Sequence, residues 1–162
     1  MHSYKILIVE DESDLADSIK QLLINEYPHI DIAENGQVAL ALFESNHYDL
    51  IISDILMPVL SGHDFVRSLR LKGVHTPVIF ITGNGTKDLV QSALKLGAVD
   101  FIDKPITLSV LRDIISSTLE IEQHKKNIVD LQRDSNPDPE LIRSEQMALG
   151  IKQVSRDKKK RF

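Results

Sequence analysis

Side chains that can handle a phosphoryl group stand at the ends of the apolar runs of this sequence. Glu10-Asp11-Glu12 follow the first run, Asp54 ends the third, Thr82 ends the fourth and Lys104 follows the fifth. Carboxylates with no His or Cys beside them suit a hard, oxygen-seeking cation, and Mg²⁺ takes one or two carboxylates together with waters and phosphate oxygens. An aspartate can also act as the nucleophile that forms an aspartyl-phosphate.

The lysine and the threonine complete this chemistry. A lysine ammonium and a threonine hydroxyl bind phosphoryl oxygens, while a bound metal offsets the charge that develops during transfer. Asp54, Thr82 and Lys104, with Asp11 for the metal, therefore supply the parts needed to place a phosphoryl group on Asp54. By itself, Asp54 would be an ordinary strand-end aspartate that caps the next turn. The presence of the other three residues favours the chemical interpretation.

The two glutamates beside Asp11 receive different interpretations. Glu10 stands directly after the apolar run and is assigned to the metal site. Glu12 has two more acids downstream, Asp14 and Asp17, so it is interpreted as part of the solvated, acidic start of a helix. Negative charge is favoured there because the amino end of a helix dipole is positive.

Five short apolar runs separated by helix-like stretches must position these side chains. The first, third and fourth runs are continuously apolar rather than alternating, as expected for strands covered on both faces. Strands separated by helices imply parallel pairing and right-handed crossovers. The runs are residues 5–9, 30–33, 50–54, 77–82 and 99–103, and the helical stretches lie at 14–24, 36–44, 64–71, 86–96 and from 107 onward.

This pattern predicts an α/β fold, a flavodoxin-like doubly wound sheet of five parallel strands. The expected strand order, 2-1-3-4-5, rests on what such folds usually adopt, because periodicity alone does not give the order. Ligands of these sheets bind outside the carboxyl ends of the strands. The predicted fold therefore brings the acids, the threonine and the lysine to one edge.

Composition sets the class of protein. Of the 162 residues, 42% are apolar and 27% are charged, and no stretch approaches the ~20 apolar residues of a membrane-spanning helix. Cysteine is absent, which excludes disulfides and thiolate chemistry, and the first residues lack the pattern of a secretory signal. These features fit a cytoplasmic protein. The net charge of −5 gives no general case for nucleic-acid binding.

Charge and composition change near residue 120, where we place a domain boundary. Residues 1–120 carry nine Lys and Arg against 17 Asp and Glu, whereas residues 121–162 carry ten against seven. Every glycine except Gly150 lies before the change. We therefore expect a domain over residues 1–121 and a helical extension or linker with a basic tail over residues 122–162.

The extension is expected to begin as a continuation of the last helix of the domain, which would run over residues 107–133. Its apolar residues fall roughly on an a/d spacing interrupted by polar ones, so two interpretations stay open. The helix either caps its own domain or forms a coiled coil with a second copy or a partner. A break at residues 135–139 then leads into a short helix over residues 139–149. The four cations of residues 158–161 form a solvated tail or bind an anionic partner.

These residues resemble the motif set of the receiver domain of two-component response regulators. The resemblance covers about residues 4–121, and its pieces occur in order at strand ends, which makes the combination specific although each piece alone is weak. It implies a phospho-accepting signalling domain rather than an enzyme. The pieces are Glu10-Asp11, Asp54 with Met57-Pro58, Thr82-Gly83, and Phe101-Ile102-Asp103-Lys104-Pro105.

The resemblance implies a role for each residue of the site. Asp54 would accept the phosphoryl group from a phosphohistidine of a sensor histidine kinase or a histidine phosphotransfer protein. Asp11 and Asp54 would hold Mg²⁺, with Glu10 reaching it directly or through water and the Leu56 backbone carbonyl as a further ligand. Lys104 would pair with a phosphoryl oxygen, or with Asp54 before phosphorylation.

The same resemblance implies a switch and sites that tune the phosphoryl lifetime. Thr82 would bond to the phosphoryl group and move toward it on activation, and Phe101 would be the switch residue. Because Phe101 has no hydroxyl, the switch would work by packing. A cis peptide bond would join Lys104-Pro105, as X–Pro bonds allow. Leu56 cannot orient an attacking water, which points to slow loss of the phosphoryl group, whereas Asn84 could position one.

Output and alternatives follow from the length of the extension. Some forty residues are too few for a typical effector domain, so the chain is a stand-alone receiver working through protein contacts or the front of a longer regulator or kinase. A homodimer through the last helix or the extension is one form that the output would take. The alternative function is a receiver-like interaction module that is never phosphorylated. A dehalogenase-type phosphatase is disfavoured because it needs a second Asp where Leu56 stands.

Overall fold

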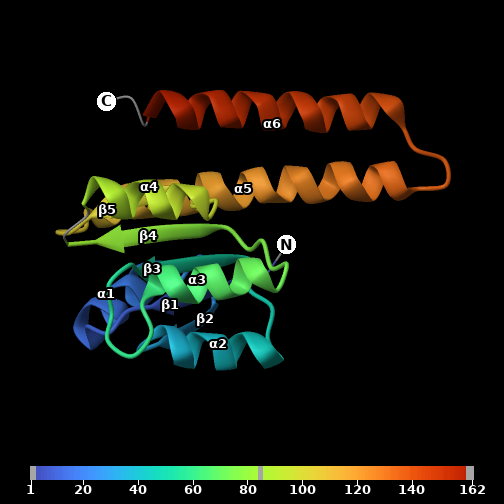
Figure 1. Cartoon of the computed structure of the whole chain (residues 1–162). Coiled ribbons are helices and arrows are strands. Elements are labelled where there is room, and N and C mark those ends of the chain that lie inside the picture. The colour runs from blue at the N-terminus through green and yellow to red at the C-terminus, as the bar shows by residue number, and fades with distance from the viewer. Residues whose placement is uncertain (1–2, 84–85, 160–162) are drawn as a thin grey trace. The chain divides into compact units, whose positions relative to one another are not determined.

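The first part of the chain is built on a parallel β-sheet. The computed structural model describes residues 3–83 and 86–159, and the chain divides into two compact units, Met1–Arg112 and Asp113–Phe162. The sheet has five strands in the order β2-β1-β3-β4-β5, which confirms the predicted flavodoxin-like fold (Figure 1). The strands are β1 (Lys5–Val9), β2 (His29–Ala33), β3 (Leu50–Asp54), β4 (Val78–Thr82) and β5 (Asp100–Asp103).

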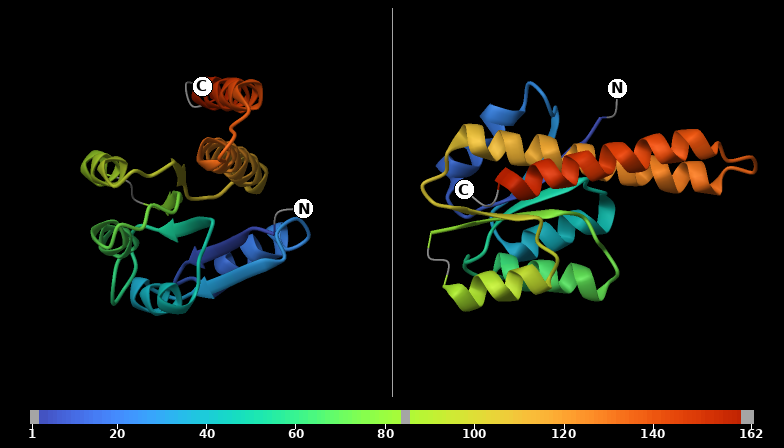
Figure 2. Two further views of the ribbon diagram at one scale, coloured as in Figure 1. Left: turned by 90° about the vertical axis from the view of Figure 1, so that its right-hand side faces the viewer. Right: turned by 90° about the horizontal axis from the view of Figure 1, so that it is seen from above.

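Helices cover both faces of this sheet. Helix α1 lies on one face, and α2, α3 and α4 lie on the other (Figure 2). The bounds of these helices are α1 (Ser13–Leu23), α2 (Gly36–Ser45), α3 (Gly62–Leu71) and α4 (Lys87–Lys95). Because helices lie on both sides, the central strands have no solvated face, and β3 and β4 are buried over their whole length. This explains why their sequences are continuously apolar.

The sheet register brings the ends of the strands together. In the parallel pairs, Val9 of β1 lies beside Ser53 of β3, Asp54 lies beside Ile81 of β4, and Thr82 lies beside Asp103 of β5. The residues that follow β1, β3, β4 and β5 therefore emerge at the same edge, where the predicted site lies.

Most helices of this unit begin with a capping side chain. The side chains of Asn35, Ser61 and Thr86 accept hydrogen bonds from backbone N–H groups in the first turns of α2, α3 and α4. These residue types are the ones that N-cap positions favour. The N-cap position of α1 is held by Glu12, whose side chain makes no capping hydrogen bond.

The second unit is a helical hairpin. Helix α5 (Leu108–Arg133) begins in the first unit and matches the predicted helix to within one residue, and α6 (Pro139–Lys159) follows a short turn. Glu145 of α6 accepts hydrogen bonds from Asn127 Nδ2 at 3.2 Å and pairs with His124 Nδ1 at 2.6 Å. Lys152, farther along α6, pairs with Glu120, earlier in α5, so the two helices are antiparallel.

Helix α6 corrects the predicted end of the last helix. The expected helix stopped at Leu149, whereas α6 continues through Gly150 to Lys159. A glycine costs a helix about 1 kcal/mol relative to alanine, which does not end it when good helix formers follow. Of the basic tail, residues 160 and 161 lie outside the described residues, and the role of this tail stays a prediction.

Two expectations concern the chain as a whole. The domain boundary at residue 121 stays a prediction, because the continuous helix α5 passes through it. Within residues 3–83 and 86–159, no helix is both long and apolar enough to cross a membrane.

Candidate functional site

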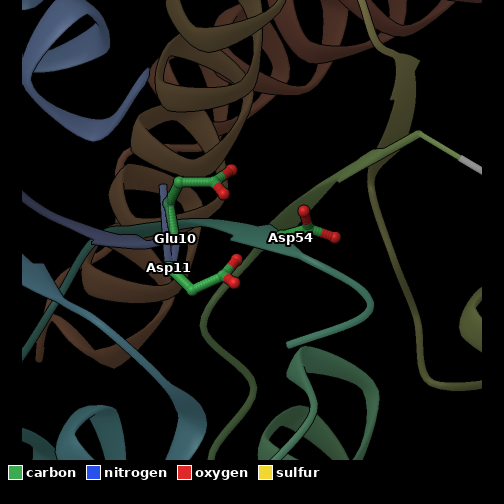
Figure 3. A group of neighbouring side chains, drawn as sticks. All are labelled: Glu10, Asp11 and Asp54. Carbon is green, nitrogen blue, oxygen red and sulfur yellow. The ribbon is translucent and has the colours of Figure 1, made fainter. Parts of the chain in front are cut away.

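Three carboxylates converge at the carboxyl edge of the sheet. Glu10 and Asp11 follow β1 directly, Asp54 is the last residue of β3, and each offers a carboxylate oxygen within 4.8 Å of the others. Figure 3 shows the side chains of Glu10 and Asp11 extending toward Asp54. Glu10 and Asp54 are buried and Asp11 is exposed, so the cluster is open to solvent on one side. The structure therefore brings together the acids that the sequence assigned to a metal site.

The position of the Asp54 carboxylate is fixed through both of its oxygens. Oδ1 accepts a hydrogen bond from the backbone N–H of Leu56 at 2.9 Å, and Oδ2 lies 2.7 Å from Lys104 Nζ. The buried hydroxyl of Ser53 donates to the Asp54 carbonyl at 2.8 Å. The first two contacts orient the carboxylate, and the third anchors the Asp54 backbone, before any ligand arrives.

Gly62 makes this arrangement possible by letting the chain return close to β3. A Cβ atom on Gly62 would lie 1.8 Å from the Asp54 carbonyl oxygen and 2.4 Å from Ser53 Oγ, which excludes every other residue type without a backbone shift. The N–H of Gly62 donates to the Ile55 carbonyl at 3.0 Å and secures the return. The sequence signal was a glycine at a helix start, which was not assigned to the site.

Lys104 is the central cation of the site. Its Nζ lies 2.7 Å from Asp54 Oδ2, 2.9 Å from Glu12 Oε1 and 3.2 Å from Glu10 Oε2. Its backbone N–H donates to the Thr82 carbonyl at 2.8 Å, which ties the start of the following loop to β4. The Lys104-Pro105 peptide bond is cis. Lys104 thus reaches back across the edge of the sheet to three acids at once.

The charges of the site influence one another's protonation. Burial raises the pKa of Glu10 above its usual value, against the smaller opposing effects of the Glu12 N–H and the Lys104 charge. Burial by itself would lower the pKa of Lys104, but its hydrogen bonds to Asp54 and Glu12 and the nearby acidic charges raise it above the ordinary value. The ammonium is therefore held firmly protonated, while Glu10 is a carboxylate in an unfavourable position.

Glu10 also supplies a direct indication that a cation belongs here. Its Oε2 is buried and accepts no hydrogen bond from any described residue, although Lys104 lies within ion-pair distance. A buried carboxylate oxygen left without a hydrogen bond is costly, and a metal ligand bond would satisfy it. Oxygen ligands from two or three carboxylates are also what a hard divalent cation prefers. The residues present therefore fit Mg²⁺.

Thr82 and Phe101, which the sequence assigned to a conformational switch, lie on the neighbouring strands β4 and β5. Thr82 ends β4 and is buried, with its register partner Asp103 one residue before Lys104. Phe101 is half-buried in β5 and stacks on Phe80, with 5.8 Å between ring centroids. Their switch roles stay predictions. Of the two lifetime positions, Leu56 is 52% exposed, and Asn84 lies outside the described residues.

The comparison with known proteins decides the family. The family model described as the response regulator receiver domain matches residues 6–116. The chain belongs to the response regulator receiver family. It is therefore a receiver of two-component phosphorelay signalling, as the sequence resemblance indicated. The curated relatives include the response regulator ArlR of Staphylococcus saprophyticus, 39% identical over 79% of this chain, and the regulatory protein AtoC of Escherichia coli, 32% identical over 76%.

Solved structures agree that the chain is a receiver domain. The signal receiver domain of a putative Luxo repressor protein from Vibrio parahaemolyticus matches with a TM-score of 0.72 and 30% identity, covering 82% of this chain and 99% of that one. A CheY-like response regulator receiver domain protein from Methanospirillum hungatei matches with a TM-score of 0.69 and 30% identity, covering 77% and 99%. The curated relatives are longer than this receiver, which spans 57% of ArlR and 27% of AtoC.

Proposed function

We propose that Asp54 accepts a phosphoryl group from a phosphohistidine on a sensor histidine kinase or a histidine phosphotransfer protein, with Mg²⁺ bound beside it. The observation that carries the proposal is the position of the Asp54 carboxylate. It lies 2.7 Å from the Lys104 ammonium and within 4.8 Å of the carboxylate oxygens of Glu10 and Asp11. An anchored nucleophile, a cation for the phosphoryl oxygens and a place for a metal are thereby in contact.

The transfer balances without any further reactant. A carboxylate oxygen of Asp54 attacks the phosphorus of the donor, a P–O bond forms, and the P–N bond to the donor imidazole breaks. The bonding electrons go to the imidazole nitrogen, and the donor leaves as neutral imidazole when its other ring nitrogen carries a proton. Lys104 gives up no proton in this step and pairs with a phosphoryl oxygen. The product is an acyl phosphate on Asp54.

The metal would be held by Asp11 and Asp54, with Glu10 and the Leu56 carbonyl as further ligands. Mg²⁺ supplies positive charge that neutralises the phosphoryl oxygens. The buried, unsatisfied Oε2 of Glu10 supports its inclusion, and the burial of Asp54 keeps bulk water away from the carboxylate.

The output is proposed to be a change in protein contacts rather than a reaction on a separate substrate. Thr82 would be drawn toward the phosphoryl group, and Phe101 would occupy the space that it leaves. Phe101 lies on the strand that leads through Lys104 toward α5, so a change in its packing is positioned to alter the contacts of that helix. A homodimer through α5 or the extension is one such output, and sedimentation with and without a phosphoryl mimic tests it.

A labelling experiment with matched variants tests the proposal. The chain is incubated with acetyl phosphate and Mg²⁺ and separated on a phosphate-affinity gel, beside the variants D54N and D103N. Asp103 is an exposed acid that ends β5, next to the site, so D103N removes an equal charge without removing the nucleophile. We expect labelled wild type and D103N and unlabelled D54N. Labelled D54N would sink the assignment of Asp54, and unlabelled wild type would favour the interaction module that is never phosphorylated.

A further inference from the structure

The Glu12 side chain is turned away from the helix that it starts. Glu12 occupies the N-cap position of α1 with extended backbone, yet its carboxylate accepts no hydrogen bond from the first turn. The corresponding residues of α2, α3 and α4 all make that bond. Glutamate is not among the side chains that N-cap positions favour, so the Glu12 carboxylate is available for a contact outside the helix.

That contact is with Lys104. Glu12 Oε1 lies 2.9 Å from Lys104 Nζ, although 66% of the Glu12 side chain is exposed. The backbone N–H of Glu12 donates to Glu10 Oε1 at 3.2 Å, which fixes the residue at the edge of the acid cluster. Glu12 is not one of the three residues whose oxygens form that cluster. It therefore touches the lysine of the site without belonging to the candidate metal ligands.

We propose that Glu12 is a positioning residue that holds Lys104 at the rim of the site and competes with phosphoryl oxygens for its ammonium. The inference rests on the proposed function, in which Lys104 binds the phosphoryl group. During phosphorylation, Lys104 would lose its contact with Asp54 because the carboxylate oxygen of Asp54 enters the acyl phosphate. It would lose its contact with Glu10 because a bound cation would attract the Glu10 carboxylate. Glu12 undergoes neither change, so its ion pair with Lys104 persists and shifts the equilibrium toward the unphosphorylated state.

The size of this bias follows from exposure. An ion pair open to water contributes little, so releasing Lys104 from Glu12 should tighten the binding of a phosphoryl mimic roughly twofold to fivefold. Two effects of a Glu12 substitution would both increase the affinity for the mimic. One is loss of the contact with Lys104, and the other is loss of a negative charge near an incoming anion. The test must separate them.

Three variants make that separation. E12Q removes the charge and weakens the contact, whereas E12D keeps the charge but withdraws it from Lys104 by one methylene. D14N removes an equal charge from the exposed first turn of the same helix, and the structure shows no bond between the Asp14 carboxylate and Lys104. The affinity for beryllofluoride, a phosphoryl mimic, is measured by calorimetry at saturating Mg²⁺ for each protein.

A second readout needs neither metal nor mimic. The rate at which an N-hydroxysuccinimide ester acetylates Lys104 is followed by peptide mass spectrometry in the metal-free protein. Exposed Lys72 serves as an internal reference in each sample. Release from Glu12 should speed the reaction of Lys104, because the ion pair with Glu12 shields the amine from the ester.

We expect E12Q and E12D to bind beryllofluoride more tightly and to expose Lys104 to acetylation, with D14N close to wild type in both measurements. Tighter binding in E12Q and D14N but not in E12D would overturn the proposal in favour of a general charge effect, and so would equal values in all four proteins. A wild type that does not bind beryllofluoride counts against the proposed function instead. The acetylation rates then still support or overturn the contact between Glu12 and Lys104.

Discussion

Replacing Lys104 by methionine should reveal how much of the stability of this receiver depends on one ammonium. Lys104 Nζ pairs with Asp54 and Glu10, whose side chains are 9% and 1% exposed. Removing one partner from a buried ion pair costs about 3–5 kcal/mol, because the other charge stays buried and unpaired. Lys104 itself is 18% exposed, so solvent reduces the penalty and we expect a loss near the lower end, about 3 kcal/mol. The pair with exposed Glu12 adds less than about 1 kcal/mol.

The loss should appear as a lower melting temperature that depends on pH. For a chain of this length, about 3 kcal/mol corresponds to roughly 6–12 °C, measured by calorimetry in a metal-free buffer at pH 7. Burial already raises the pKa of Glu10, and removing the nearby ammonium raises it further. A carboxyl whose folded pKa lies above its unfolded value destabilises the protein when ionised and stops doing so once it is protonated. The difference in melting temperature between K104M and wild type should therefore become smaller as the pH falls from 7 toward 4.5.

Metal provides the third part of the same prediction. A divalent cation should restore part of the missing positive charge, so Mg²⁺ should raise the melting temperature of K104M more than that of wild type. The control is K72M, which removes an equal charge from an exposed lysine at the end of α3. If K104M and K72M have the same melting temperature at pH 7, the buried ion pairs contribute less stability than we expect. The same conclusion follows if acidification leaves the difference in melting temperature between K104M and wild type unchanged.

Three further predictions concern metal, backbone strain and the hairpin. D11A should melt higher than wild type without metal, because one of three clustered acids is gone, and should gain less from Mg²⁺ in the same thermal scan. V59N should stabilise the receiver by about 1–2 kcal/mol in urea unfolding, because Val59 is a β-branched residue at a φ of 70° and asparagine tolerates that region better. The hydrogen bond with His124 lowers the pKa of Glu145, so its contribution to the hairpin should be lost as the pH falls below 4.5. Amide exchange in α6 should then speed up in wild type but not in E145Q.

The fold was predictable because its signals are local. The apolar runs of β1, β3 and β4 are continuous since helices cover both faces of the sheet, and each run is followed by a helical period. Parallel pairing then follows from chain connectivity, and the edge at which Asp54, Thr82 and Lys104 meet follows from parallel pairing. The end of α6 was mispredicted because one glycine weakens a helix without ending it.

The contacts within the site were less predictable than its residues. Glu12 lies exposed at the start of α1, as predicted, but nothing in the local sequence indicated that Lys104, 92 positions later, would contact its carboxylate. Gly62 likewise looks like an ordinary helix start until the return of the chain to within contact of Asp54 is known. Both features depend on distances between segments remote in sequence, and the spacing of residue types carries no such distances.

Charge balance links stability, metal binding and phosphorylation in this receiver. Glu10, Glu12 and Asp54 all form ion pairs with Lys104, and among the described residues no other lysine or arginine is recorded in an ion pair with them; Asp11 lies beside Glu10 and Asp54. A phosphorylated hydroxyl residue carries about −1.5 to −2 charge near pH 7, and an aspartyl-phosphate should be similar, so a phosphoryl group on Asp54 would make the balance still more negative. In the proposed function, a divalent cation would offset this charge, and Lys104 would have to be available to the new oxygens. Because Glu12 contacts the same ammonium from outside the three clustered acids, this exposed contact would add a small bias toward the resting arrangement to the larger contributions of Asp54 and Glu10.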